Sequence, residues 1–208
     1  MSTLDLTRIN AELGQNPPAL IDWTLGVSQR PVITSNFAPF AAVLLHMLTR
    51  VRPDIPVLWI DAGYATPATY RTAQDIIDQL QLNMVVRQPP RSRARREALE
   101  GPPPGLDQPE RLAAFTREVK LDPFALAVGE IKPDVWFTAL RAESTATRAA
   151  MQPVSRNRDG LLKVSPLLHW SSRQMHEYCQ QHGLPNNFDY FDPTKLEGHR
   201  ECGLHTAH

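Results

Sequence analysis

The sequence is poor in cysteine: only Cys179 and Cys202 occur among its 208 residues. Two thiols cannot build the disulfide framework of a small secreted protein, and they cannot supply the four cysteine ligands of an intrachain iron–sulfur cluster. Any redox chemistry of this chain therefore runs through a single thiol or a bound partner. We expect neither a metal nor another cofactor.

Net charge and long apolar runs are absent too. The 22 basic and 22 acidic side chains cancel, which argues against a large surface for duplex nucleic acid, although a few well-placed cations can still bind a small anion. No run reaches the roughly 18 apolar residues of a membrane span, and residues 1–16 are too polar for a signal peptide. We therefore expect a cytoplasmic protein that binds neither nucleic acid nor membrane.

What the chain does contain is an alternation of short apolar runs with helical patterns. Strands are predicted over residues 31–34, 56–60, 83–86, 135–140 and 161–164, and helical patterns over residues 5–13, 40–48, 67–80 and 109–130, the last interrupted at Pro123. This order predicts an α/β fold with a three-layer, doubly wound and mostly parallel sheet. We expect a single domain over residues 1–185 and, because periodicity fades, a mobile C-terminal tail over residues 186–208.

The turns that follow three of the strands are candidate binding loops, since ligands of parallel sheets bind beyond the carboxyl ends of the strands. We expect the turns over residues 34–38, 61–66 and 141–148 to share one crevice. After the first of these strands, Ser35 or Asn36 is expected to cap a helix that has Pro39 in its first turn.

Residues 87–96 hold five arginines and are followed by the sequence GPPPG. The proline-rich tract and the charge run together predict a solvent-exposed loop. A loop that closes over a substrate is the alternative.

The two cysteines have different settings. Ser171 and Gln174 form a capping-box pair, which starts a helix that runs to about residue 182. On this helix Met175, Tyr178 and Cys179 share the apolar face, so Cys179 is expected to be a buried core thiol.

Cys202 lies near the end of the chain, outside any apolar periodicity. The neighbouring Arg200 and the histidines His199 and His205 favour the thiolate, which is the nucleophilic form, and Gly203 removes steric bulk beside the sulfur. Two other interpretations of Cys202 stay open. The first is an incidental cysteine of the tail. The second is a zinc ligand together with the two histidines, although no second Cys/His cluster completes such a site.

The RECGLH sequence of residues 200–205 resembles the catalytic signature of the phosphoadenylyl-sulfate (PAPS) reductases, relatives of the adenine nucleotide α-hydrolases. Five further segments resemble motifs of that family in the same order: ITSNF at 33–37 with the helix that follows, DAGYATPATY at 61–70, KLDP at 120–123, LRAESTATRA at 140–149 and KVSPLLHW at 163–170. The resemblance runs from about residue 30 to 205. Phe115 and Thr116 stand where members with an iron–sulfur cluster carry paired cysteines, so the chain resembles the cluster-free type.

The resemblance implies an adenine nucleotide α-hydrolase-like fold, whose domain over residues 1–185 would bind the nucleotide. It implies thiol-dependent reduction of PAPS to sulfite and adenosine 3′,5′-bisphosphate in assimilatory sulfate reduction. The Cys202 thiolate would attack the sulfur of this sulfonucleotide and become an S-sulfocysteine. Thioredoxin or glutaredoxin would then release sulfite, and the assembly would be a homodimer.

The resemblance also implies the site residues, with Cys202 as the catalytic residue. Arg141 and Arg148 would clamp the phosphosulfate or the ribose 3′-phosphate; the alternative is a surface ion pair with Glu143. Asp61 would contact the nucleoside or shape its turn, and Lys163 would bind the same anion or cap a strand end. The expected substrate-binding residues are Thr34, Ser35, Asn36, Phe37, Asp61, Gly63, Arg141, Glu143, Ser144, Arg148, Lys163, Arg200 and His205.

The chain departs from the family pattern in three places. Ala38 stands where the phosphate loop has glycine, and the Pro39 after it lacks an amide donor. His169 replaces a usual aspartate, and residues 183–199 lack the expected run with tryptophan and aspartate. The alternatives are a member that binds a nucleotide without turnover, one that acts on another sulfonucleotide such as adenylyl sulfate, and a redox-sensing or metal-binding tail.

Overall fold

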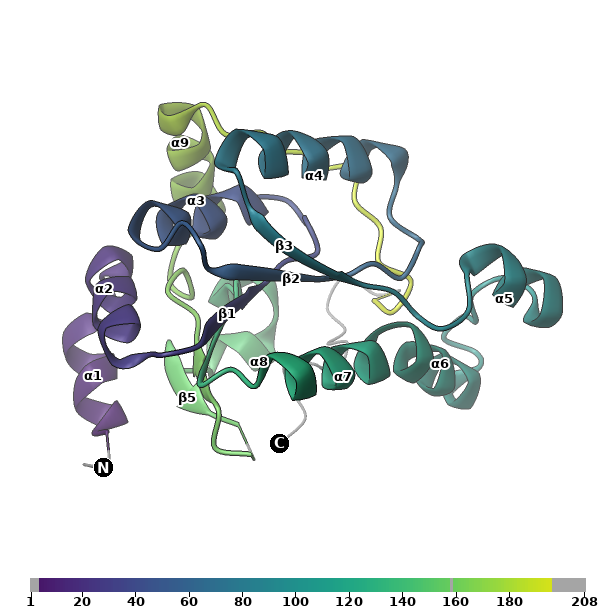
Figure 1. Ribbon diagram of the computed structural model, residues 1–208, viewed down its shortest axis with the longest axis horizontal. Coiled ribbons are helices and arrows are strands. Elements are labelled where there is room, and N and C mark those ends of the chain that lie inside the picture. The colour runs from purple at the N-terminus through teal and green to yellow at the C-terminus, as the bar shows by residue number, and fades with distance from the viewer. Residues whose placement is uncertain (1–3, 158, 196–208) are drawn as a thin grey trace.

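The computed structural model describes residues 4–157 and 159–195 (Figure 1). Its sheet has six strands in the order β3–β2–β1–β4–β6–β5. The strands are β1 (Pro31–Thr34), β2 (Pro56–Ile60), β3 (Asn83–Arg87), β4 (Val135–Phe137), β5 (Val154–Arg156) and β6 (Leu162–Val164). Neighbouring strands pair in parallel except β5, which runs antiparallel to β6. The predicted α/β fold with a mostly parallel sheet is confirmed.

Helices cover both faces of this sheet (Figure 1). One face carries α1 (Leu6–Leu13), α2 (Pro17–Val27), α3 (Ala41–Val51), α4 (Pro67–Leu80) and α9 (Ser172–His182). The other face carries α7 (Asp122–Ile131), which continues α6 (Pro109–Thr116) through a π-helical turn, Arg117–Leu121. The helix α5 (Arg93–Glu100) follows β3, and a short 3-10 helix (Ala142–Ser144) and α8 (Ala146–Ala149) follow β4. None of the helices in the described residues is long and apolar enough to cross a membrane.

Alternate strand residues enter the two halves of the core. Ile33 and Val57 pack in the cluster with α2, α3, α4 and α9, whereas Val32 and Leu58 pack in the cluster with α7. All four side chains are almost completely buried. A strand that is covered on both faces needs apolar residues at every position, which is why these strands appear in the sequence as uninterrupted apolar runs.

Several local signals are confirmed. The capping box at the start of α9 is present, with the Ser171 side chain and Gln174 satisfying each other's backbone amides. Cys179 on this helix is 5% exposed, so it is a buried core thiol as expected. The helix α4 begins at Pro67, and the Thr66 hydroxyl before it accepts a hydrogen bond from the Thr69 amide at 3.1 Å.

The expected start of α3 is wrong. The helix begins at Ala41, and its N-cap is Phe40, a residue with φ of 66° whose side chain makes no capping hydrogen bond. Ser35 and Asn36 do not cap the helix, because their side chains accept hydrogen bonds from the amides of the loop itself. Pro39 therefore precedes the helix rather than standing in its first turn.

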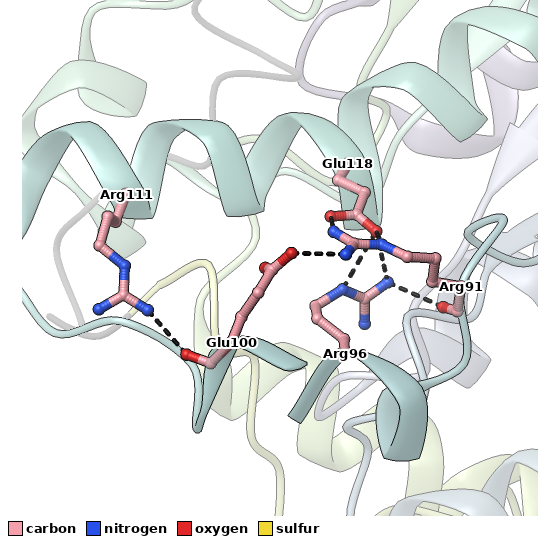
Figure 2. A network of polar contacts seen from close by, with 5 residues as sticks. All are labelled: Arg91, Arg96, Glu100, Arg111 and Glu118. Atoms are coloured by element: carbon pink, nitrogen blue, oxygen red, sulfur yellow. Dashed lines mark hydrogen bonds and ion pairs between the residues drawn. The ribbon is translucent and has the colours of Figure 1, made fainter. Parts of the chain in front are cut away.

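The exposed loop expected over residues 87–96 is present only in part: residues 88–92 are a loop, but a helix begins at Arg93 and Arg96 is buried. Most of its arginines lie in or next to α5, which Ser92 caps by accepting a hydrogen bond from the Arg95 amide. Arg96 is 2% exposed, and its charge is compensated by Glu118 of the π-helical turn (Figure 2). Arg96 can therefore be buried because Glu118, which is distant in the sequence, compensates its charge. The residues next to Arg96 in the sequence give no sign of this partner.

Prolines stand at the beginnings of two helices. Pro17 and Pro18 begin α2, a helix that was not expected, and Pro123, the expected interruption of the pattern over residues 109–130, stands in the first turn of α7. In a first helical turn the missing amide costs no hydrogen bond, so proline is tolerated there. The strand expected over residues 135–140 ends at Phe137, and the antiparallel edge strand β5 was not expected.

Candidate active site at the carboxyl end of the sheet

A cavity of about 170 Å³ lies beyond the carboxyl ends of β1, β2 and β4. Its polar lining comes from the turn after β1, the segment after β4, the π-helical turn, α8 and the last described residues: Thr34, Ser35, Asn36, Thr138, Lys120, Arg148, Tyr190 and Lys195. Among the described residues that line it, three are cationic and none is a carboxylate. The arrangement favours a small anionic ligand at the strand ends, where parallel sheets bind their ligands.

The turn after β1 is held in a tight shape by its own side chains. The Phe37 amide donates to the Ser35 hydroxyl at 3.1 Å, and the Ala38 amide donates to the side-chain oxygen Oδ1 of Asn36 at 3.3 Å. Phe37 has φ of 52° and is 2% exposed, with its ring edge-to-face against Trp59 at 4.8 Å. Thr34, Ser35 and Asn36 thus line the cavity, whereas the side chain of Phe37 anchors the loop in the core.

The two arginines expected to act as one clamp have different surroundings. Arg148 is 9% exposed and lines the cavity. Arg141 forms an ion pair with Glu143, donates to the Ser172 hydroxyl at 2.8 Å and lies 5.5 Å from the ring centre of Phe40. The Glu143 carboxylate also accepts from Ser172 at 2.5 Å, so the ion-pair alternative describes Arg141 in this structure. Ser144 lies beside them on the 3-10 helix and does not line the cavity.

The turn after β2 lies in a second hollow next to the cavity. The Asp61 carboxylate shapes this turn by accepting from the Gly63 amide at 2.9 Å and from the Tyr70 hydroxyl at 2.6 Å. Burial and the hydrogen bond to Asp61 raise the pKa of Tyr70. Gly63 has φ of 81°, a conformation that favours glycine. Asp61 lines the second hollow, and Lys120 and Tyr190 line both, so the single crevice expected from the sequence is two adjoining hollows.

Lys163 does not line either hollow. It stands in the middle of β6, and its ammonium group lies 5.5 Å from the ring centre of Trp136 on β4. Trp136 packs with Phe124 of α7, which places Lys163 over the face of the sheet rather than at its carboxyl end.

Residues 186–195, here called the C-terminal strap, run over the loops of the site. The Phe40 amide donates to the Asn186 side-chain carbonyl at 2.7 Å, and Asn36 donates to the Tyr190 hydroxyl at 2.5 Å. The hydroxyls of Thr66 and Thr69 both donate to the Asp189 carbonyl oxygen, at 2.7 and 2.9 Å. The strap therefore joins the turn after β1 to the start of α4 and forms part of the cavity wall.

Lys120 is the functional candidate that the expected site residues leave out. Its ammonium group donates to the Asp192 carboxylate at 2.5 Å and to the Thr194 hydroxyl at 3.2 Å. Burial would raise the pKa of Asp192, but the charge and hydrogen bond of Lys120, with help from Thr194, hold it below its ordinary value. The KLDP segment was the available signal for Lys120. Tyr190 and Lys195 had none, because only the folded strap brings them to the cavity.

Comparison with known proteins identifies the family. The model of the phosphoadenosine phosphosulfate reductase domain matches residues 30–191, which is most of the chain. The chain belongs to the PAPS reductase family. The resemblance seen in the sequence is thereby confirmed, and with it the expectation of an oxidoreductase enzyme.

Curated relatives and solved structures agree with this family. The chain is 36% identical over 182 residues to a phosphoadenosine 5′-phosphosulfate reductase of Synechococcus, with 86% of this chain and 78% of the relative covered. It is 37% identical over 211 residues to the reductase of that name from Xanthomonas euvesicatoria, with 98% and 83% covered. The crystal structure of Candida auris PAPS reductase in a phosphate complex aligns with a TM-score of 0.76 at 19% identity, over 90% of this chain and 91% of that one. This last likeness shows the fold, which agrees with the adenine nucleotide α-hydrolase-like arrangement expected.

The expected residues of the RECGLH segment, Arg200, Cys202 and His205, lie outside the described residues. Of the expected substrate-binding residues that the structure describes, four line the cavity: Thr34, Ser35, Asn36 and Arg148.

Proposed function

We propose that this chain reduces PAPS to sulfite and adenosine 3′,5′-bisphosphate, with Cys202 as the nucleophile. Support comes from the family and from one observation above all: the cavity at the strand ends has three cationic side chains and no carboxylate among its described lining residues. A ligand with several phosphoryl or sulfonyl oxygens is the chemistry that such a lining fits.

The alternative thiol does not suit this role. Cys179 is 5% exposed on α9, and burial raises the pKa of its thiol, so the nucleophilic thiolate is disfavoured there. Cys202 follows Lys195 by seven residues, and seven extended residues span at most about 25 Å. Because Lys195 lines the cavity, this length of chain is enough for the Cys202 sulfur to reach an anion bound there.

The proposed reaction has two steps. The Cys202 thiolate forms a bond to the sulfur of PAPS while the bond from that sulfur to the phosphate oxygen breaks, and the nucleotide leaves with the electron pair. A dithiol protein then attacks the Cys202 sulfur of the S-sulfocysteine, and sulfite leaves with the pair of the sulfur–sulfur bond. The second thiol of the reductant resolves the mixed disulfide and restores Cys202. Thioredoxin or glutaredoxin as this reductant, a homodimer and a cytoplasmic location belong to the same proposal.

Intact-mass measurement after incubation with PAPS tests the proposal. The wild-type chain is expected to gain one sulfonate group, which thioredoxin releases as sulfite. Cys202→Ser is expected to gain none, and Cys179→Ser, as the matched control, is expected to gain it normally. A sulfonate on Cys179, or sulfite formation by Cys202→Ser, would show that the assigned nucleophile is wrong.

A second candidate, nucleotide binding without turnover, is favoured by the turn after β1. Pro39 has no amide, and the amides of Phe37, Ala38 and Phe40 already donate to side-chain oxygens of the protein. Such a loop offers fewer donors to a phosphate group than a glycine-rich one. Binding of adenosine 3′,5′-bisphosphate without sulfite from either PAPS or adenylyl sulfate would support this candidate instead.

A further inference from the structure

The π-helical turn Arg117–Leu121 joins the active site to a partly buried ion network around Arg96. Turns of this kind are rare and often occur at functional sites. Glu118 and Lys120 lie two residues apart on it but contact different neighbours: Glu118 meets Arg91 and Arg96, whereas Lys120 lies between the two hollows of the site. Val119 between them is fully buried. The backbone that carries Lys120 is therefore held by the residue before it and by the contacts of Glu118.

Two arginines hold the Glu118 carboxylate (Figure 2). Arg91 contacts both of its oxygens, with Nε 2.7 Å from Oε1 and Nη2 bonded to Oε2. Arg96 donates to Oε1 from Nε at 3.3 Å and from Nη2 at 3.2 Å, and its Nη2 also donates to the Arg91 carbonyl oxygen at 2.8 Å. The hydrogen bonds from Arg91, reinforced by those from Arg96, lower the pKa of Glu118 to about 2. The carboxylate is thus charged and clamped at all ordinary pH values.

The network is tied to the neighbouring helices on both sides. Arg91 also pairs with the Glu100 carboxylate at 2.5 Å, and Arg111 of α6 donates to the Glu100 carbonyl oxygen at 3.0 Å (Figure 2). Nη1 of Arg96 is buried without a hydrogen-bond partner among the described residues. Glu118 is therefore the carboxylate that compensates the charge of the buried Arg96 guanidinium.

We propose that Glu118 is a positioning residue that fixes Lys120 at the wall between the two hollows of the site; the significance of this for substrate binding rests on the proposed function. In this structure the Lys120 ammonium is held by Asp192 and Thr194 of the strap. An anionic substrate that takes the place of Asp192 removes that support. The Lys120 backbone then depends on Glu118 and its two arginines to keep the ammonium group in the site.

Chemical labelling of amines tests the position of Lys120 without any reference to catalysis. The chain has four lysines, Lys120, Lys132, Lys163 and Lys195, whose acetylation rates can be followed separately by peptide mass spectrometry. In the wild type we expect slow labelling of Lys120, whose side chain is 11% exposed and ion-paired. In Glu118→Gln we expect the Lys120 rate to rise by about tenfold, which corresponds to about 1.4 kcal/mol in a local opening equilibrium.

Three comparisons separate positioning from general loosening of the fold. The Lys163 rate should rise by a smaller factor than the Lys120 rate in Glu118→Gln, because a purely global destabilisation would raise both rates by the same factor. Glu97→Gln, which breaks the Arg93–Glu97 pair on α5, is the matched control and should leave Lys120 slow. Arg91→Gln removes one of the two arginines that hold Glu118, and Arg91 is partly exposed. The Lys120 labelling rate is therefore measured in this variant if Glu118→Gln does not fold.

Kinetics then test whether the position matters for substrate. Glu118→Gln and Lys120→Ala should each raise KM for PAPS by about tenfold, and the double variant should be no worse than Lys120→Ala, because both changes remove the same interaction. Unchanged Lys120 labelling in both Glu118→Gln and Arg91→Gln would overturn the proposal, as would fully additive effects on KM. A wild-type chain that forms no sulfite would refute the proposed function, and the labelling would still decide the role of Glu118.

Discussion

Replacing Glu118 by glutamine should destabilise the fold by an amount that depends on pH. The pKa of this carboxyl lies at about 2 against an ordinary value of 4.5, a difference equivalent to about 3 kcal/mol in favour of the charged, folded form. About a quarter of the side chain is exposed (24%), so solvent screening reduces this figure, whereas the uncompensated charge left on buried Arg96 increases it. We expect the free energy of unfolding at about pH 7 to fall by about 2–3 kcal/mol.

The pH dependence follows from the direction of the shift. Because the pKa is lower in the folded than in the unfolded chain, the carboxylate stabilises the fold fully above about pH 5. This stabilisation is lost as the pH falls from 4.5 toward 2, and at about pH 3 less than half of it remains. The gap in stability between wild type and Glu118→Gln should therefore narrow by about 2 kcal/mol on acidification.

Urea denaturation followed by circular dichroism, at about pH 7 and about pH 3, measures this gap. The control Glu97→Gln removes an exposed pair on the neighbouring helix, and it should cost only about 0.3–0.5 kcal/mol. If Glu118→Gln is no less stable than Glu97→Gln, or if its loss of stability is the same at both pH values, the charged Glu118 carboxylate does not stabilise the fold.

Three other predictions concern single side chains. Cys179 should react with a thiol reagent only after the chain is unfolded, since burial raises its pKa and hides it; rapid labelling in the native Cys202→Ser variant would contradict this. Asp134→Ala should lower the free energy of unfolding by about 2 kcal/mol, because the Asp134 carboxylate accepts hydrogen bonds from Ser28 and from two backbone amides. The pKa of this carboxyl lies below its ordinary value, so the difference in stability between wild type and variant should become smaller in acid, where the wild-type carboxyl is protonated. Asp192→Asn should tighten binding of adenosine 3′,5′-bisphosphate several-fold in calorimetry, because the carboxylate that competes for Lys120 is removed; weaker binding would show that the pair supports the site instead.

Much of the fold could be predicted from local sequence patterns. The runs at 31–34 and 56–60 are the strands β1 and β2 with the expected bounds, since a strand that is buried on both faces must be apolar throughout. The capping box at Ser171 and the burial of Cys179 follow from spacing along a single helix. The helix α2 was not expected, and its first residues are Pro17 and Pro18, which are tolerated in a first helical turn.

The candidate site was readable only in part. The loop after β1 and Arg148 reach the cavity as expected, because strand order places them there. The separation of Arg141 from Arg148 was not readable, since it depends on Ser172 and Phe40. The position of the Arg141 guanidinium thus depends on contacts with residues that are distant in the sequence.

The sequence alone determined the parallel α/β scaffold, the family and the inert core position of Cys179, because each depends on residues that are close together or follow a repeated pattern. Tertiary structure decided the rest. Arg96 is buried because Glu118 lies beside it in space, and Lys120 meets Asp192 because the strap returns across the sheet. The attraction between two charges depends on their distance in the folded chain, and the number of residues between them in the sequence does not give that distance.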